Sequence, residues 1–551
     1  MSLFGDLYVG TSGLQTSQEA LNVVAHNVTN TDTEGYVRQQ VSQATRDYNT
    51  LSVDVKSVSY KQTGLGVYIE EVRQVRDRFI DASYREEFGR QQFYDVSYGC
   101  IEEIEEILGE MDGANFNESM SELWTAIEEL VKDPSSEVCQ SMLVQYSQTF
   151  AEAAKSVYNG LADYQDKLNN KIKTSVDQVN DIGHKIYQLN MQIRGIEAGG
   201  VENANDLKDQ RNLLLDQLGG LCNISYNEDF FGNVLVKIEG HDFVMMDRVN
   251  DMGCQPNKET GFYDCFWPDS AKFDFDEEGN KVFRPETAMA FNMDLEISAK
   301  LDTDVGGLKG LVLARGDHRA DYTDLATEET YDKVKDSVLM NVMAEFDGLV
   351  HSVVTAVNKV LYDNADPATG YLCDDNGNPL QIFERISCEE YELDEATGTW
   401  THITEDPNNS ATWFTSSNLT VNQELLQYPS HLGMIRPDGS VDYETAKALE
   451  KAFAEKEYVL NPELTNSISI SEYYSNLVGQ VANSGNVYKT LSENQQMTVE
   501  SVEASRQGAI GVSTDEELSN MIKFQNAYNA SSRFINVIDE CIEHIINTLG
   551  T

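Results

Sequence analysis

The acidic segment from Asp274 to Gly279 holds the residues that come closest to a ligand-binding motif. Asp274, Asp276 and Glu278 alternate along it, as carboxylate ligands do in the first half of a calcium-binding loop. Such a loop also needs a bidentate glutamate at its twelfth position, where this sequence has Pro285. The spacing therefore favours a hairpin turn, and we predict no metal ion and no cofactor.

Neither the histidines nor the acidic pairs form a recognised catalytic pattern. The eight histidines include no HExxH or other close pair, which a metalloprotease helix requires. No GxGxxG, Walker or GxSxG motif occurs in the sequence. Glu102-Glu103 and Glu105-Glu106 fall on the polar side of an amphipathic helical pattern. We therefore predict that the chain is not an enzyme.

The charge balance restricts the partners. The 551 residues include 40 basic and 92 acidic side chains, which gives a formal charge of -52. Such a surface repels nucleic acid, which proteins bind through Lys and Arg on phosphates, and it disfavours anionic membranes. No apolar run approaches the about 18 residues of a transmembrane helix. The first residues lack a secretory signal pattern, so we expect a cytoplasmic protein unless its export route reads no cleavable signal.

The eight cysteines show neither CxxC spacing nor the pattern of a disulfide framework. We expect most of them to be small, buried apolar residues. Cys254 with Cys265, and Cys373 with Cys388, could bridge β-hairpins in an oxidising compartment.

Very long helices are compatible with the first third of the chain, because no proline precedes Pro134. Apolar residues recur every three or four positions from about 135 to 197, which predicts one helix of roughly eleven turns. Asp133-Pro134 is a typical helix start and Gly199-Gly200 a typical end. A second helix is predicted from Asn205 to Leu218.

Short alternating runs separated by turn dipeptides predict strands in the middle of the chain. The clearest runs are 234–238, 273–275 and 293–297, with a turn at Glu278-Gly279-Asn280. Helical periodicity returns over about 325–362 and again after 464. The predicted fold class is therefore α+β and multidomain, with a long helical-bundle or coiled-coil body made by the N- and C-terminal segments and β-rich domains inserted in the middle. The predicted divisions are 1–45 with 512–551 as terminal helical segments, 46–222 with 306–365 and 464–511 as the helical core, and 223–305 and 366–463 as the β-rich insertions.

Both ends of the chain carry apolar seams. Seven-residue spacing on the first helix predicts a seam made by Leu7, Leu14, Leu21 and Val28. Small or slim residues hold the other seam position, where two helices could approach closely, namely Gly10, Ser17 and Val24.

The last helix is predicted to open with a capping box of Thr514 and Glu517. Its apolar stripe consists of Leu518, Met521, Ile522, Tyr528, Ile535, Ile538, Ile542, Ile545 and Leu549. A strip this apolar must be covered. Either the end helices pack on the body of their own chain, or they pair with each other and with other copies, and these patterns leave both open.

The N-terminal segment resembles the signature of axial flagellar proteins, which form the rod, the hook and the hook-associated parts of the flagellum. The matching positions are Asn27, Asn30, Gly35 and Tyr36, which suit a helix end and the turn after it. The sequence departs from the common pattern at His26, Thr29 and Glu34.

Further motifs resemble the FlgK family of hook-associated proteins. The segment Asn205–Leu214 is similar to that family's helical-domain signature through Asn205, Asp206, Leu207, Asp209, Gln210 and Arg211. Residues 306–310 and 511–530 continue the likeness, which covers about two-thirds of the chain. The stretches 225–300 and 385–460 hold no motif of the family.

This resemblance implies a structural component of the bacterial flagellum. It implies export without a cleavable signal through the flagellar type III apparatus with an export chaperone, and an extracellular location at the hook–filament junction. The partners implied are copies of the chain in a ring, the hook protein below and hook-associated protein 3 above. The terminal helices would form the assembly interface and the β-rich insertions would face outward. The alternatives are a hook or distal rod protein of the same axial family, or a secreted binding module carried on the flagellum.

Overall fold

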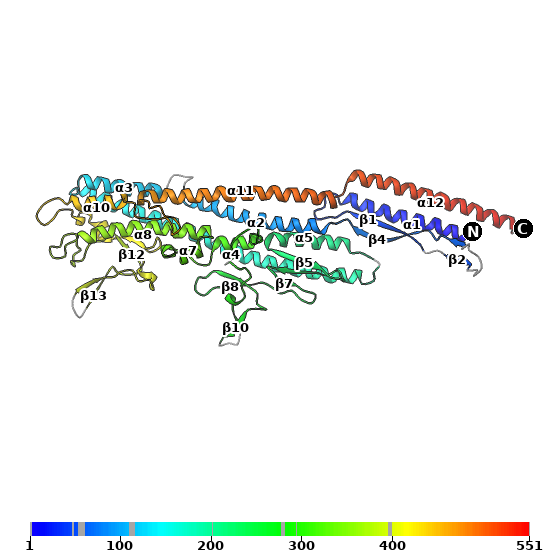
Figure 1. Cartoon of the computed structure of the whole chain (residues 1–551), viewed down its shortest axis with the longest axis horizontal. Coiled ribbons are helices and arrows are strands. Elements are labelled where there is room, and N and C mark those ends of the chain that lie inside the picture. Colours follow the sequence, from blue (N-terminus) through cyan, green and yellow to red (C-terminus); the bar gives the residue numbers. More distant parts are fainter. Residues whose placement is uncertain are drawn as a thin grey trace.

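The computed structural model describes residues 3–46, 49–52, 61–109, 116–200, 202–276, 281–293, 295–394 and 399–549. The molecule is an elongated rod with helices running along most of its length (Figure 1). A helical body carries small strand pairs along one side, and a narrower extension at one end holds both termini. The α+β multidomain class predicted from the sequence is confirmed.

Within the described residues, ten helices belong to the body. They are α2 (Arg78–Ile107), α3 (Phe116–Lys132), α4 (Glu137–Glu197), α5 (Asn205–Leu221), α6 (Gly307–Arg315), α7 (Glu328–Val334), α8 (Val338–Asn364), α9 (Gln423–Gln427), α10 (Tyr443–Ala454) and α11 (Ile470–Ile510). Short 3-10 turns lie at η1 (Pro285–Thr287), η2 (Tyr322–Leu325), η3 (Ser410–Thr412) and η4 (Pro429–Leu432). The long helices α2, α4 and α11 run lengthwise through the body and bury a continuous apolar core (Figure 1).

The 61-residue helix α4 confirms the long helix predicted from periodicity. Its predicted start is wrong, because the helix begins after Ser136 and not at Asp133-Pro134. The Asp133 carboxylate accepts from Ser135 Oγ at 2.8 Å and the Asp133 carbonyl accepts from Ser136 N–H, so Asp133 builds the preceding turn. The predicted end holds, since α4 ends at Glu197 and Gly200 has a positive φ of 62°.

The strands form small antiparallel units. One three-stranded sheet contains β5 (Ile224–Glu228), β6 (Val234–Ile238) and β7 (His241–Val244). The other pairs in the body are β8 (Gly253–Pro256) with β9 (Tyr263–Phe266), β10 (Lys272–Phe275) with β11 (Lys281–Arg284), β12 (Phe383–Arg385) with β15 (Leu419–Val421), and β13 (Tyr391–Asp394) with β14 (Thr399–His402). Residues 278–280, predicted as a turn and as part of a calcium-like loop, lie outside the described residues.

The strand predicted over residues 293–297 is wrong. The described part of that segment is irregular, and a side chain takes up the hydrogen bonds that a strand partner would make. Thr303 Oγ1 donates to the Glu296 carbonyl at 2.7 Å and accepts from Ser298 N–H at 2.8 Å. Alternating apolar and polar residues do not by themselves show whether a neighbouring strand is available to hydrogen-bond a short segment.

Several features bear on the expected chemistry. Within the described ranges, no group of three or more His, Cys, Asp and Glu side chains is arranged to hold a metal ion. None of the described helices combines the length and the apolarity needed to span a bilayer. All eight cysteines are free, and Cys254 stands opposite Cys265 across the β8–β9 pair.

The extension, here called the terminal arm, consists of α1 (Leu3–Thr29), β1 (Gln39–Thr45), β4 (Val67–Gln74) and α12 (Thr514–Leu549). A further pair, β2 (Asn49–Ser52) with β3 (Lys61–Thr63), extends the hairpin that β1 and β4 form. In Figure 1, α12 lies alongside α1 and continues the line of α11 beyond the body. The predicted division at residue 45 therefore differs from the structure, because β4 pairs with β1 and belongs to the arm.

Small residues on α1 let α12 approach closely. Gly10, Ser17 and Val24 are buried, as the second seam position predicted. A Cβ atom added at Gly10 would lie 2.8 Å from Ile535 Cγ1, and one added at Gly13 would lie 2.9 Å from Ser531 Oγ. The four residues of the predicted leucine seam flank this contact and are only half-buried: Leu7, Leu14, Leu21 and Val28.

The apolar stripe of α12 divides into two parts. Ile538 is buried and four members are half-buried, namely Met521, Tyr528, Ile535 and Ile542. Leu518, Ile522 and Ile545 are exposed, while the side chain of Leu549 lies outside the described residues. Of the two alternatives that the sequence left open, the structure shows the end helices pairing with each other, because α1 and α12 cover part of each other.

Enlarging Gly10 should separate the two arm helices. We expect Gly10→Leu to destabilise the α1–α12 pair by about 1–3 kcal/mol, because the new side chain must displace Ile535. Faster amide hydrogen exchange confined to α1 and α12 would confirm this. Gly195→Ala in α4 is the matched control, since nothing lies within 4 Å of its added Cβ. Unchanged exchange in Gly10→Leu would contradict the packing described.

Candidate functional site

The residues that carry the family resemblance meet where the terminal arm joins the body. Asn27, near the end of α1, is 1% exposed and uses its whole side-chain amide. Its Nδ2 donates to the Gln39 carbonyl at 2.9 Å and to Glu517 Oε2 at 3.1 Å. Its Oδ1 accepts from Gln39 N–H at 3.0 Å and from the Tyr36 hydroxyl at 2.7 Å. One side chain therefore ties α1, the start of β1 and the first turn of α12 together.

Glu517 does not form the predicted capping box with Thr514. Its carboxylate is 2% exposed and, besides Asn27, it binds Arg38, with Oε1 2.9 Å from Nε and 2.8 Å from Nη2. Arg38 also reaches Glu516 at 3.0 Å, and its N–H donates to the carbonyl of Ile510 at the end of α11. The Glu517 carboxylate is therefore engaged in a tertiary contact, and Ser513 Oγ accepts from Glu516 N–H at the start of α12 instead.

The second family motif, at the start of α5, makes hydrogen bonds to both long strands of the arm, β1 and β4, and to the residues next to them. Asp209 Oδ2 accepts from Val37 N–H at 3.3 Å, and its Oδ1 accepts from Gln74 Nε2 at 2.7 Å. Asn205 Nδ2 donates to the Val72 carbonyl at 3.0 Å, and Gln39 Nε2 donates to Asp206 Oδ1 at 3.0 Å. The start of α5 therefore holds β1 and β4 against the body.

The remaining motif residues are placed around this contact. Arg211 points into the body, where its Nη1 donates to Asn190 Oδ1 at 2.9 Å and its Nη2 to Glu228 Oε1 at 3.0 Å. Gly35 has a positive φ of 76° and lies against Leu213, as the predicted turn requires. Asn30 closes α1 through its side chain on the His26 carbonyl, whereas Leu207 is half-buried and Gln210 is exposed.

A ladder of buried charges supports the joint from the body side, and no motif in the sequence predicted it. Arg85 and Arg506 bind opposite oxygens of Asp216, both at 2.6 Å. Arg506 also lies 3.2 Å from Asp81, which binds Arg76 through its other oxygen. The ladder connects α2, α5 and α11. Its bonded pairs lie from 5 to more than 400 positions apart, so no local spacing marks the whole ladder.

Burial changes the acidity of the joint. Desolvation raises the pKa of Asp209 to about 7, although the Val37 N–H and the nearby Arg76 work in the opposite direction. Desolvation, together with the carboxylates of Asp209, Asp206 and Glu517, also raises the pKa of the Tyr36 phenol. The joint thus holds a carboxylate that is close to its midpoint at neutral pH.

Comparisons with known proteins agree with this arrangement. A family model described as the flagellar hook-associated protein FlgK helical domain matches residues 101–370. Flagellar hook-associated protein 1 of Bacillus subtilis (strain 168) is 26% identical over 100% of this chain and 99% of its own length. The corresponding protein of Escherichia coli (strain K12) is 24% identical over 97% of this chain and 98% of its own. The chain belongs to the FlgK family of flagellar hook-associated proteins.

The other comparisons are consistent with this family. The models of the basal body rod protein and of the FlgEFG rod protein C-terminal region match residues 7–36 and 506–548. The solved structure of the hook junction protein FlgK from Burkholderia pseudomallei has a TM-score of 0.53 at 12% identity and covers 78% of this chain and 100% of its own, which shows a shared fold. As a FlgK family member, the chain is a structural component of the flagellar hook–filament junction.

The FlgK family match also bears on the choice between a junction protein and a hook or distal rod protein. The rod models cover only the ends of the chain, and the helical-domain model covers the body between them. This favours the junction protein over the hook or rod alternative. The ends that the rod models match are α1 with the following turn, and the end of α11 with α12, which together hold Asn27, Tyr36 and Glu517.

Removing the Asn27 amide should loosen the arm. We expect Asn27→Ala to lower the free energy of opening of α1 and α12 by about 2–4 kcal/mol, because several buried partners lose their hydrogen bonds. Native-state hydrogen exchange measures this directly. Asn30→Ala is the control from the same motif, and it should cost about 1 kcal/mol because its side chain bonds only locally, to the His26 carbonyl and the Thr33 hydroxyl. Equal effects of the two substitutions would refute the role given to Asn27.

The joint should weaken as pH rises. The pKa of Asp209 is raised to about 7 in the folded chain, above its usual unfolded value of about 3.9, so the native joint binds the extra proton. Its stability should therefore fall between about pH 4 and pH 7 and level off above. Protection factors of the Val37 and Arg38 amides at pH 5 and pH 8 measure this, and Asp209→Asn should remove the trend. A joint that becomes better protected with rising pH would contradict it.

Proposed function

We propose that the terminal arm is the assembly segment of this junction protein. Arms of neighbouring copies would lie side by side in a ring around the axial channel, with the hook protein below and hook-associated protein 3 above. Residues 223–305 and 366–463 would face outward. The role uses no catalytic group, and the chain would reach its extracellular site through the flagellar type III apparatus with the help of an export chaperone.

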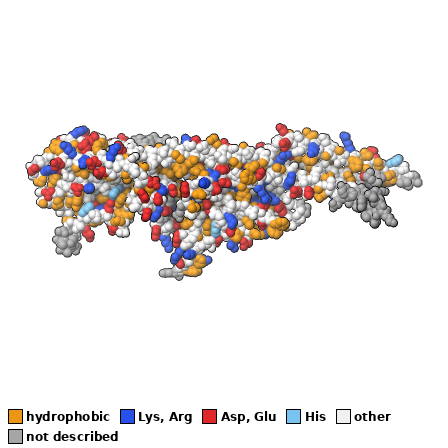
Figure 2. All heavy atoms as spheres, in the orientation of Figure 1, with side chains coloured by type: hydrophobic (Ala, Val, Ile, Leu, Met, Phe, Trp, Pro, Cys, Tyr) orange, Lys and Arg blue, Asp and Glu red, His pale blue; other side chains and the backbone are white. Residues whose placement is uncertain are grey.

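The observation that carries this proposal is the exposed apolar surface that α12 keeps after it has paired with α1. Six large apolar side chains of the helix are between 38% and 64% exposed: Leu518, Ile522, Phe534, Val537, Ile545 and Ile546. Apolar side chains concentrated on one narrow helix favour burial against another apolar surface. Figure 2 shows orange side chains along this end of the molecule, among few charged ones.

The shape of the arm suits packing between copies. The Gly-lined contact keeps α1 and α12 close together, so the pair presents a slim rod with two exposed flanks. The hydrogen-bonded joint holds this rod in line with the body (Figure 1). Neighbouring arms can then meet along their length while the wider, acidic bodies stay further apart.

Charges on the exposed flank should block assembly without unfolding the arm. We expect Leu518→Asp with Ile522→Asp to abolish incorporation into flagella, because contact with a neighbour would bury two unpaired charges. Both residues are exposed, so the circular dichroism and hydrogen exchange of the purified chain should be unchanged. Ile535 is an unsuitable position because it packs against Gly10 of α1, and Ile542 is unsuitable because it is half-buried within the chain.

The matched control adds the same two charges elsewhere on the helix. Ser519→Asp with Asn526→Asp changes two exposed polar positions of α12, and we expect filaments to form normally. Flagella counted by electron microscopy, with flagellin measured in the medium, give the result. Normal filaments from the Leu518 and Ile522 variant would refute the assembly role of this flank.

A further inference from the structure

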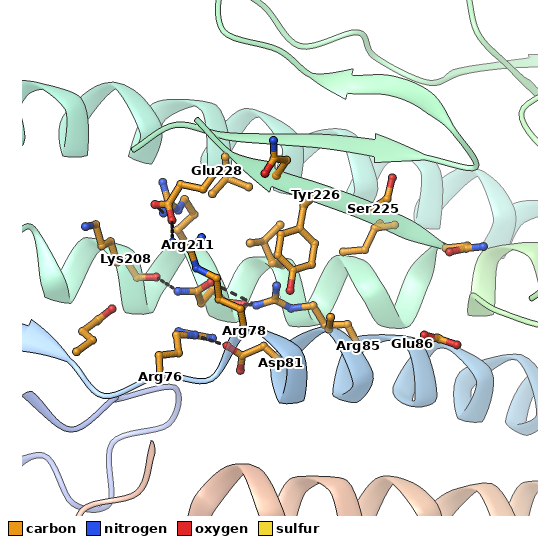
Figure 3. A pocket seen from close by; sticks show the side chains of 18 of the residues that line it. Arg76, Arg78, Asp81, Arg85, Glu86, Lys208, Arg211, Ser225, Tyr226 and Glu228 are labelled. Atoms are coloured by element: carbon orange, nitrogen blue, oxygen red, sulfur yellow. Dashed lines mark hydrogen bonds and ion pairs between the residues drawn. The ribbon is translucent and has the colours of Figure 1, made fainter. Parts of the chain in front are cut away.

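A basic cleft lies beside the joint, between the β4–α2 connection, α5 and β5 (Figure 3). It has a volume of about 730 Å³. Its cationic lining residues are Arg73, Arg76, Arg78, Arg85, Lys208 and Arg211. Figure 2 shows Lys and Arg side chains gathered where the arm meets the body. In a chain with 92 acidic and 40 basic residues, this is a local reversal of the charge balance.

Arg76 is the least satisfied cation of the cleft. Its side chain is 13% exposed, and its Nε binds Asp81 Oδ2. Its Nη1 and Nη2 atoms are buried and have no hydrogen-bond partner. A guanidinium carries five N–H donors in a fixed plane, and a buried charged donor without an acceptor is costly. The two free nitrogens of one guanidinium match the two oxygens of a carboxylate.

The carboxylates near the cleft are already shared. Asp81 binds Arg76 through Oδ2, and its Oδ1 makes an ion pair with Arg506 Nε at 3.2 Å without accepting a hydrogen bond. Arg506 also meets Asp216 at 2.6 Å and Glu503, which is one-third exposed, at 3.5 Å. None of these carboxylates accepts a hydrogen bond from Nη1 or Nη2 of Arg76.

The carboxylates on the α5 and β5 side of the cleft are also already paired. Glu228 divides its oxygens between Arg211 at 3.0 Å and Arg78 at 2.7 Å. Lys208 binds Glu197 at 2.7 Å, and Arg73 donates to the amide oxygen of Gln40. Arg78 is 80% exposed at the rim, so it can turn to a new partner at little cost. The other two acidic lining residues, Glu86 and Asp302, both bind Arg90. The cleft is therefore lined by six cationic and four acidic side chains.

We propose that this cleft receives an Asp or Glu carboxylate from the adjacent copy of the chain in the assembled ring, with Arg76 as its bidentate partner. This inference rests on the proposed function, which places arms and their bases next to one another. Acidic copies brought together repel each other. A basic cleft at the base of each arm offsets that repulsion locally and sets the register between neighbours.

A labelled acidic peptide tests the cleft on the isolated full-length chain. We expect a fluorescein-labelled hexaglutamate peptide to bind, and a labelled hexaglutamine peptide not to bind, by fluorescence anisotropy. Arg76→Gln should weaken hexaglutamate binding at least tenfold while keeping one donor for Asp81. Arg76→Lys, which keeps the charge and loses the planar fork, should fall between the two.

The control substitution is Arg319→Gln, which removes a half-exposed arginine that binds Asp166 away from the cleft. It should leave peptide binding unchanged, and circular dichroism should show that all variants fold. Equal peptide affinity for Arg76→Gln and Arg319→Gln would overturn the proposal. Thermal stabilisation by sodium sulfate that depends on Arg76, without peptide binding, would show an inorganic anion site instead and would also overturn it.

Assembly in cells separates this inference from the proposed function. We expect Arg76→Gln to lower incorporation into flagella several-fold relative to Arg319→Gln. Normal incorporation of Arg76→Gln, with the charged Leu518 and Ile522 variant still excluded, would refute the cleft contact and leave the assembly role of the arm intact. Incorporation of both would refute the assembly role as well.

Discussion

The structure depends on the buried hydrogen-bonded joint around Asn27 and Glu517. These two side chains are 490 positions apart, and with Arg38 and Asp209 they connect α1, β1, α5 and α12. Asn27, Glu517 and Asp209 are buried and Arg38 is half-buried. Glu517 binds both Asn27 and Arg38, while Asp209 accepts from Val37 N–H and Gln74. Buried polar groups are stable only when fully paired, so the joint can form in few geometries. This is the physical reason why a slim arm can extend from the body in a defined direction.

The arm itself combines two opposing demands. It needs a close internal contact to remain helical, and α1 meets this with glycines and other small residues against the larger side chains of α12. It also needs an apolar outer surface to associate with other subunits. Large residues of α12 that do not face α1, such as Ile522 and Val537, are left outside. A helix pair packed through large side chains would be wider and would have fewer apolar groups to offer.

The acidic surface limits which regions of the molecule can attract other subunits. A charge of -52 disfavours unspecific association of the bodies, so attraction must come from limited regions. The apolar flanks of the arm and the basic cleft at its base are two such regions. They lie on either side of the joint, which makes the joint the fixed reference for both.

Much of the fold was predictable from periodicity. The long helix α4, the start of α5 and the helical C-terminal region follow from apolar spacing that needs no partner to be recognised. Short segments were less certain, as residues 293–297 show, because the Thr303 side chain replaces a strand partner there. The start of α4 was misplaced since Asp133 serves a turn, and turns and caps use the same residue types.

By itself, the sequence determined the helical ends, the β-rich middle and the family, since spacing and motifs are local properties. Only the tertiary structure decided which seam of α1 faces α12, why Glu517 leaves its cap for Asn27, and that Arg76, Arg506 and Asp81 form one ladder. These depend on which distant groups are dehydrated together. Burial converts ordinary charged and polar residues into partners, and no spacing along the chain encodes it.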